Sequence, residues 1–109
     1  MQPHTCTVTG SFIHAATRRP VQGLVRFTPD RLWVVLDGTA WACLAPEVVL
    51  APDGSFVAQV TATDTDPVGL RYLVQTPAGQ FLAVVPWREN GYTLKELADG
   101  YRPAARSQD

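Results

Sequence analysis

The sequence is poor in charged residues, in cysteine and in long hydrophobic runs. Charged residues make up 17% of the chain and the formal net charge is -1, against roughly 25% charged residues in an average soluble domain. This balance gives no electrostatic reason to expect nucleic acid or an anionic membrane as a partner. No apolar run approaches the ~20 residues of a membrane span, and residues 1–5 lack the basic start of a signal peptide. We therefore expect neither a leader nor insertion into a membrane.

Cysteine and histidine are too few to form a metal site of recognisable spacing. The chain has two residues of each kind, and no CxxC or HxxxH pattern. We expect Cys6 and Cys43 to be reduced and to pack as small hydrophobic side chains, with a late disulfide as the alternative. His4 has the spacing to share a strand face with Cys6, but two ligands do not make a zinc site. The acidic run at 64–66 resembles the start of a calcium loop, but Pro67 follows where further ligands are needed. We predict no metal and no cofactor.

No pattern in the chain marks a catalytic site. Nucleophilic catalysis needs a Ser or Cys together with a base and an orienting acid. Both histidines, His4 and His14, lie near the N-terminus, and nothing marks a nucleophile turn. A glycosidase needs only two carboxylates, but the aspartates cluster at predicted turns, where solvated acidic residues are common. We predict that the protein is not an enzyme.

What the sequence does contain is period-two alternation between turn signals. Residues 5–12 alternate hydroxylated and apolar side chains, as a half-buried strand does. Similar short segments recur at spacings near ten residues, and three tight turns are predicted at Asp37-Gly38, Asp53-Gly54 and 77–79. This spacing predicts an all-β fold, a single antiparallel β-sandwich of about seven to eight strands.

The predicted centre of the chain is a three-stranded β-meander around Asp53-Gly54. An Asp-Gly hairpin turn places both residues at positive φ. Residues 48–51 precede the turn and residues 56–61 follow it with apolar side chains at period two. After a break at 64–67, residues 70–76 resume the strand pattern. We expect these three segments to pair in chain order.

The exception to the β pattern lies near the C-terminus. Thr93 and Glu96 have the spacing of a capping box, and Gly100 can close a helix at its C-terminal end. We therefore predict one or two helical turns there. The chain divides into a β-sandwich domain, residues 1–91, and a C-terminal docking segment and tail, residues 92–109, which we expect to dock on a neighbour.

The chain also holds more apolar side chains than one small core accommodates. Residues 32–36 are apolar on both strand faces, so a strand there is either buried or covered by a neighbour. One interpretation is a second face covered within the monomer, and the other is a protein–protein surface anchored by aromatic side chains. Five aromatic residues are candidate contacts: Trp33, Trp41, Trp87, Tyr92 and Tyr101.

Five segments of the chain together resemble one known family. They are VTGSF (8–12), RPVQGLVRFTP (19–29), LAPDGSF (50–56), TDTDP (63–67) and RYLV (71–74). The sequence resembles, to about Asp99, the small N-terminal β-sandwich domain of minor tail proteins from long-tailed phages of actinobacteria. In outline it is also similar to transthyretin-like and carboxypeptidase-regulatory-like sandwiches. It departs from the family in lacking the usual Trp before Tyr72.

The resemblance implies a structural protein of a bacteriophage virion. It would be a minor tail or tail-tip component that acts as an assembly adaptor between proteins, located in the virion and assembled in the host cytoplasm. Its partners would be other tail proteins and copies of itself, with no nucleic acid. The alternatives are a capsid decoration protein and a carbohydrate- or receptor-binding module that uses an exposed Trp as a sugar platform.

Overall fold

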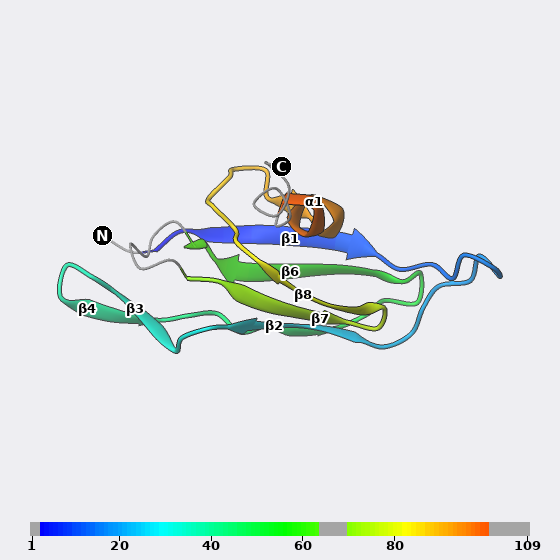
Figure 1. The fold of residues 1–109 in the computed structure, drawn as a ribbon, viewed down its shortest axis with the longest axis horizontal. Coiled ribbons are helices and arrows are strands. Elements are labelled where there is room, and N and C mark those ends of the chain that lie inside the picture. The colour runs from blue at the N-terminus through cyan, green and yellow to red at the C-terminus, as the bar shows by residue number, and fades with distance from the viewer. Residues whose placement is uncertain (1–2, 64–69, 101–109) are drawn as a thin grey trace, which may run out of the picture.

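The computed structural model describes residues 3–63 and 70–100 of the chain. Within these residues, nine strands and one helix follow one another as β1 (Thr5–Ser11), β2 (Leu24–Pro29), β3 (Trp33–Leu36), β4 (Thr39–Ala42), β5 (Glu47–Val49), β6 (Ser55–Thr61), β7 (Tyr72–Thr76), β8 (Gly79–Ala83), β9 (Tyr92–Thr93) and α1 (Leu94–Gly100). They form an all-β sandwich with a short C-terminal helix (Figure 1), which confirms the predicted fold class.

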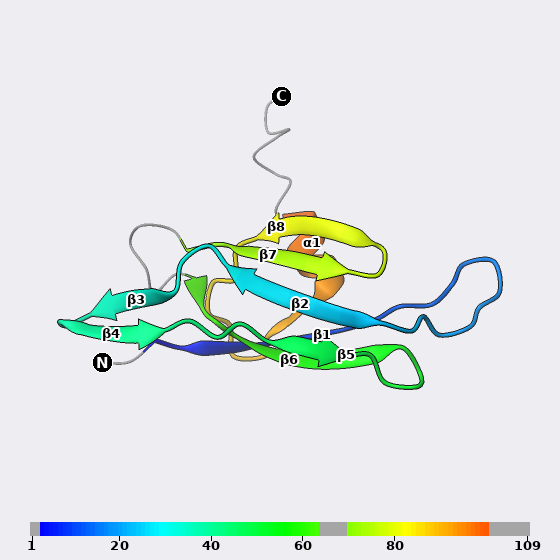
Figure 2. The ribbon, with the colours of Figure 1, turned by 90° about the horizontal axis from the view of Figure 1, so that it is seen from below.

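Two sheets make up the body of the sandwich. One has the strand order β6-β1-β9, and the other has the order β5-β2-β7-β8. Figure 2 shows β8, β7, β2 and β5 side by side in the second sheet. Neighbouring strands are antiparallel except at β9, which runs parallel to β1 over two residue pairs. The body is therefore antiparallel, as predicted, apart from this short parallel edge.

One apolar core fills the space between the two sheets. Val8 and Val60 face into it from one sheet, and Phe27 and Tyr72 face into it from the other, all four fully buried. The ring centroid of Phe27 lies 6.3 Å from that of Phe56 and 6.4 Å from that of Tyr72, edge-on to the latter. The alternation of apolar side chains therefore predicted the inward face of these strands correctly.

The predicted meander around Asp53-Gly54 is wrong. β5 pairs with β2 and β6 pairs with β1, so this turn joins strands in two different sheets. Gly54 has a positive φ of 84° but Asp53 does not, and the Asp53 carboxylate accepts a hydrogen bond from Ser55 N at 3.0 Å, as in an Asx turn. Phe12 N donates to Gly54 O at 2.9 Å. This bond to the end of β1 directs the chain after the turn into the sheet of β1 and away from β5.

The other two predicted hairpin turns are confirmed. Asp37 and Gly38 have φ values of 52° and 79°, as a type I′ turn requires, and they join β3 to β4. The turn through Pro77 joins β7 to β8, and Thr76 pairs with Gly79 across it. The Thr76 hydroxyl donates to Gly79 O at 2.8 Å. Both turns are formed by local chemistry alone.

Residues 92–100 pack on their own sandwich, whereas we expected a segment that docks on a neighbour. β9 pairs with β1, and α1 contacts both β1 and β8 (Figure 1). The predicted capping box is present, since Thr93 N donates to Glu96 Oε1 at 2.9 Å and Glu96 N donates to Thr93 Oγ1 at 3.2 Å. Leu97 is buried in the core. The remainder of the predicted tail, residues 101–109, lies outside the described residues.

Candidate functional site

A two-stranded β-ribbon, residues 32–44, projects from one end of the sandwich (Figures 1 and 2). We call these residues the arm. Within the described part of the chain, β3 and β4 pair only with each other, so both outer edges of the ribbon lack a strand partner. An isolated hairpin of this kind is marginally stable in water. The arm must therefore draw its stability from contacts at its base, on one of its faces, or with a partner.

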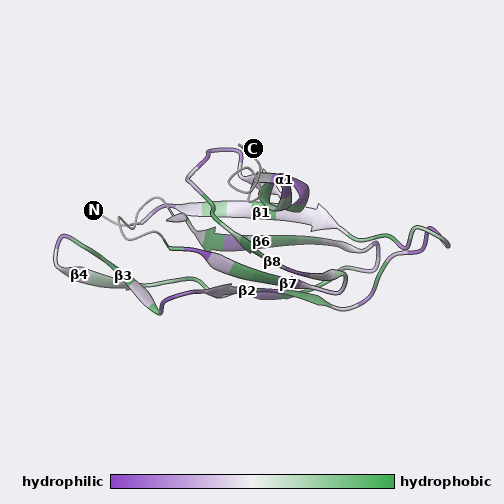
Figure 3. Cartoon of the chain, viewed as in Figure 1, coloured by the Kyte–Doolittle hydropathy of each residue, from purple (hydrophilic) through white to green (hydrophobic). Residues whose placement is uncertain are grey.

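The outer face of the arm is apolar and exposed. Cross-strand pairing places Trp33 beside Ala42 and Val35 beside Ala40 on this face. The exposed fraction is 54% for Trp33 and 57% for Val35, and it is 75% for Leu32 directly before β3. Figure 3 shows hydrophobic residues on the arm as well as along the strands of the body. Contiguous exposed apolar surface of this kind marks interaction sites on soluble proteins.

The inner face of the arm packs on the sandwich through Val34 and Trp41. Val34 is buried and Trp41 is half-buried against the core. The Trp41 indole N–H is buried and finds no hydrogen-bond acceptor among the described residues. An unsatisfied buried donor costs about 1–3 kcal/mol. Apolar contact of the ring, and not a hydrogen bond, therefore holds Trp41 in place.

Tyr72 ties the C-terminal end of the arm to both sheets. Its hydroxyl donates to Leu44 O at 2.6 Å and accepts from Thr61 N at 3.0 Å. The Thr61 hydroxyl in turn accepts from Leu44 N at 2.9 Å. Burial raises the pKa of the Tyr72 phenol above its ordinary value of 10.0. The phenol therefore keeps its proton, and its donated hydrogen bond, throughout the physiological pH range.

Asp30 ties the N-terminal end of the arm to β7. Asp30 N donates to Arg71 O at 2.9 Å, and Arg31 Nε donates to Asp30 Oδ1 at 3.0 Å. Desolvation alone would raise the pKa of this carboxyl, but hydrogen bonds from the Arg31 side chain and the Arg71 backbone outweigh it and hold the pKa below its usual value. Both ends of the arm are thus joined to the body by hydrogen bonds.

Two further candidate aromatic residues lie in the connection between β8 and α1. The ring centroid of exposed Trp87 lies 4.9 Å from that of His4. The hydroxyl of half-buried Tyr92 donates to Pro86 O at 2.9 Å, and the guanidinium carbon of Arg88 lies 4.0 Å from the Tyr92 ring centroid. Trp87 thus contacts His4, and Tyr92 contacts Arg88, within the fold.

The structure thus separates the five predicted contact residues. Trp33 and Trp41 share the arm but lie on opposite faces, Trp87 and Tyr92 lie in the connection between β8 and α1, and Tyr101 is outside the described residues. Sequence reasoning missed Leu32 as a contact candidate, although its position beside the doubly apolar strand was a usable signal. Of the five, Trp33 is the residue whose exposure and neighbours suit a partner contact.

The cysteines and the histidine considered above as metal ligands, Cys6, Cys43 and His4, lie in ordinary packing environments. Cys6 is buried and its thiol donates to Pro86 O at 3.7 Å, while Cys43 is half-buried, and no disulfide joins the two. The His4 ring packs against the Trp87 ring at a tilt of 36°. No cluster of three or more His, Cys, Asp and Glu side chains near enough to hold a metal ion occurs within residues 3–63 and 70–100.

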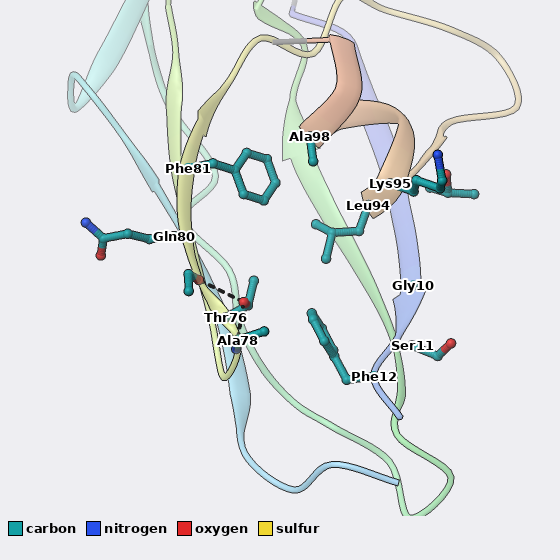
Figure 4. Close-up of a pocket in the computed structure, with 12 residues that line it drawn as sticks. Gly10, Ser11, Phe12, Thr76, Ala78, Gln80, Phe81, Leu94, Lys95 and Ala98 are labelled. Carbon is teal, nitrogen blue, oxygen red and sulfur yellow. Dashed lines mark hydrogen bonds between the residues drawn. The ribbon is translucent and has the colours of Figure 1, made fainter. Parts of the chain in front are cut away.

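A groove of about 690 Å³ opens on the body, between the sheets. The end of β1, the β7–β8 turn, β8 and α1 line it (Figure 4). Phe12, Phe81 and Leu94 form its apolar walls, and Figure 4 shows Phe81 pointing toward α1 and Gln80 pointing away. Lys95 is the charged side chain among the lining residues. Of the polar side chains in the lining, Gln80 points away and the Thr76 hydroxyl already donates to Gly79 O (Figure 4). The apolar walls therefore make the groove better suited to an apolar segment than to a small polar ligand.

No family model matches the chain, and a search of curated proteins gives no significant match. None of the helical structure in the described part of the chain has the length and apolar character needed to cross a membrane.

Proposed function

We propose that this protein is a structural component of a long-tailed bacteriophage virion, placed at the tail tip, where it joins other proteins through the arm. One observation carries the adaptor role: the apolar outer face that Trp33 and Val35 present on a projecting ribbon, with exposed Leu32 directly before it. Trp is among the residues most enriched at the energetic centres of interfaces. The phage setting is supported by the resemblance of five segments to tail proteins.

The arm has properties that favour burial in an interface. Between Leu32 and Leu44 it carries a single charged residue, Asp37 at the turn. Covering its faces therefore costs little free energy for the desolvation of charged groups. Its two ends are fixed to the body, which reduces the conformational entropy lost on binding. Its open edges offer backbone groups to a strand of the partner.

The alternatives differ in what they require of the same surface. A capsid decoration protein would use the arm in the same way, and only location in the particle separates it from a tail protein. A sugar platform needs polar groups around the aromatic ring to read hydroxyls. The neighbours of Trp33 are Leu32, Val35 and Ala42, which favours a protein partner.

The test is incorporation into virions. In a phage that carries this gene, the double substitution Trp33→Ser and Val35→Thr removes the apolar outer face without touching the core. The matched control is Val49→Thr on β5, where the valine is 74% exposed on the body. We expect the arm variant to fold, to be lost from purified particles, and to leave normal heads with defective tails, while the control incorporates like the wild type.

Four results would count against the proposal. The arm variant could incorporate as well as the wild type, or the wild-type protein could be absent from purified particles. Location on the head surface would favour the decoration protein instead. Glycan-array binding by the purified protein, lost on Trp33→Ser, would favour the carbohydrate-binding module.

A further inference from the structure

The groove lies beside an open edge of a sheet. β8 is the outermost strand of its sheet, and no other strand in the described ranges pairs with its outer side. Half-buried Phe81 projects from β8, and Phe12 and Leu94 stand across the groove from it (Figure 4). An open edge next to an apolar trough is the arrangement that receives an added β-strand, with backbone hydrogen bonds to the edge and alternate side chains in the trough. The groove is therefore shaped for an extended apolar segment.

The arm has the features that such a groove requires of its occupant. It is an extended ribbon with open edges, and its outer face, which does not pack on its own body, is apolar and exposed. Asp37 at the tip of the arm and Lys95 at the groove have opposite charge. Lys95 Nζ lies 2.7 Å from Asp99 Oδ2, in an exposed pair that contributes little to stability and is easily exchanged. The two surfaces thus share an apolar character and carry one pair of opposite charges.

The arm of the same chain does not reach this groove. Figures 1 and 2 both show the arm at one end of the longest axis and the β7–β8 turn and α1 toward the other. The hydrogen bonds of Asp30 and Leu44 hold the base of the arm to the body. An arm that occupies the groove must therefore come from another molecule.

We propose that the arm of one copy enters the groove of the next copy, so that copies of this chain join head to tail. This rests on the proposed function, because it names a second copy as a partner of the arm. The contact joins two different surfaces, so it closes into a ring if the rotation between copies permits and otherwise continues as an open chain. β3 and β4 offer four paired positions, a small contact beside the roughly 800 Å² per partner of a standard interface. The dissociation constant is expected to be micromolar or weaker.

Complementary variants of the full chain test this arrangement. The arm variant carries Trp33→Ser and Val35→Thr, and its groove is intact. The groove variant carries Ala98→Arg on α1, which fills the groove with a charged side chain, and its arm is intact. Ala78→Arg at the β7–β8 turn is a second groove variant in case the first disturbs α1. Sedimentation velocity over a concentration series, with far-UV circular dichroism as a check on folding, measures the assembly of each.

The expected result is specific to head-to-tail contact. The wild type and the Val49→Thr control should grow beyond dimers as concentration rises. Each variant alone should associate at least about tenfold more weakly, since loss of an aromatic anchor typically weakens binding by that much. An equimolar mixture of arm and groove variants should form a dimer and stop there, because only one intact arm and one intact groove remain per pair.

Other outcomes overturn the inference, and they are distinguishable from failure of the proposed function. A mixture that stays monomeric, or a groove variant that assembles like the wild type, contradicts arm-in-groove contact. If the arm variant is nevertheless lost from virions, the adaptor role stands and the arm docks on a different protein. If the arm is dispensable in both experiments, the adaptor role fails together with this inference.

Discussion

The β7–β8 hairpin and the arm obey the same local rules and differ in what surrounds them. Each is an antiparallel pair joined by a tight turn. In β7–β8, Tyr72 and Val74 are buried, and the sheet supplies a neighbour on one side. In the arm, one face is buried and the other leaves Trp33 and Val35 exposed with no strand beside either edge. Burial in the core explains the apolar side chains of the body. It does not explain the apolar side chains on the outer face of the arm, whereas burial against a partner would explain them.

The comparison is sharpest for two aromatic truncations. Phe27→Ala empties the centre of the core and is expected to destabilise the protein by about 3–5 kcal/mol. Trp33→Ala removes a side chain that lies mostly in solvent, so its expected cost is within about 0.5 kcal/mol. Urea unfolding followed by circular dichroism measures both. A loss for Trp33→Ala comparable with that for Phe27→Ala would mean that the outer arm face is part of the core.

The two Asp-Gly turns give the next largest contrast. Gly54 and Gly38 both have positive φ, so either substitution by Ala costs about 1–2 kcal/mol in backbone strain. A Cβ on Gly54 would also lie 2.4 Å from Phe12 O, while a Cβ on Gly38 would meet nothing within 4 Å. Gly54→Ala should therefore lower the unfolding free energy clearly more than Gly38→Ala does. Equal losses would show that the turn of the body is no tighter than the turn of the arm.

The same two dipeptides show how far the sequence could predict the fold. Local chemistry was enough for Asp37-Gly38, whose flanking strands pair with each other. It failed at Asp53-Gly54, because the strand after the turn pairs with β1, and Phe12, which bonds to Gly54, lies 42 residues earlier in the chain. With Val34 buried, the period-two alternation of a strand leaves Trp33 exposed on the opposite face. Which strands become neighbours depends on long-range packing, which no short segment of the sequence predicts by itself.

The groove could not be predicted from the sequence, again because it depends on long-range packing. Its walls come from Phe12, Phe81 and Leu94, which lie on three elements that meet only in the folded chain. Each has the ordinary pattern of a core residue in its own segment. Only the position of α1 against β8 leaves them half-buried around a shared opening. The exposed apolar face of the arm could thus be predicted from the pattern of one strand, whereas the groove, which three elements form together, could not.

A third prediction concerns the joint between arm and body. Tyr72→Phe keeps the ring in the core but removes the hydroxyl that bonds to Leu44 O and Thr61 N. Leaving these buried groups without a partner is expected to cost about 1–3 kcal/mol. Amide hydrogen exchange should rise more in the arm than in β7–β8. Tyr92→Phe, whose hydroxyl bonds to Pro86 O at the exposed surface, is the control and should change stability less. Uniform exchange across the arm and the body would show that Tyr72 does not hold the arm in particular.

The smallest predicted effect tests the α1 side of the groove by pH. The Thr93 backbone N–H, followed by the Arg88 guanidinium, lowers the pKa of the Glu96 carboxyl below its ordinary value of 4.5. A carboxyl with a lowered folded-state pKa stabilises the fold above the unfolded pKa, and this contribution is lost as the pH falls through the folded value. Glu96→Gln keeps the acceptor for Thr93 N but not the charge, so wild type and variant should differ in urea midpoint at pH 7 and converge in acid below pH 4.5. A midpoint difference that stays constant with pH would contradict this. Convergence would show that acid weakens the α1 wall of the groove through protonation of Glu96. The arm carries one acidic residue, Asp37, between Leu32 and Leu44, and Glu96 is not part of it.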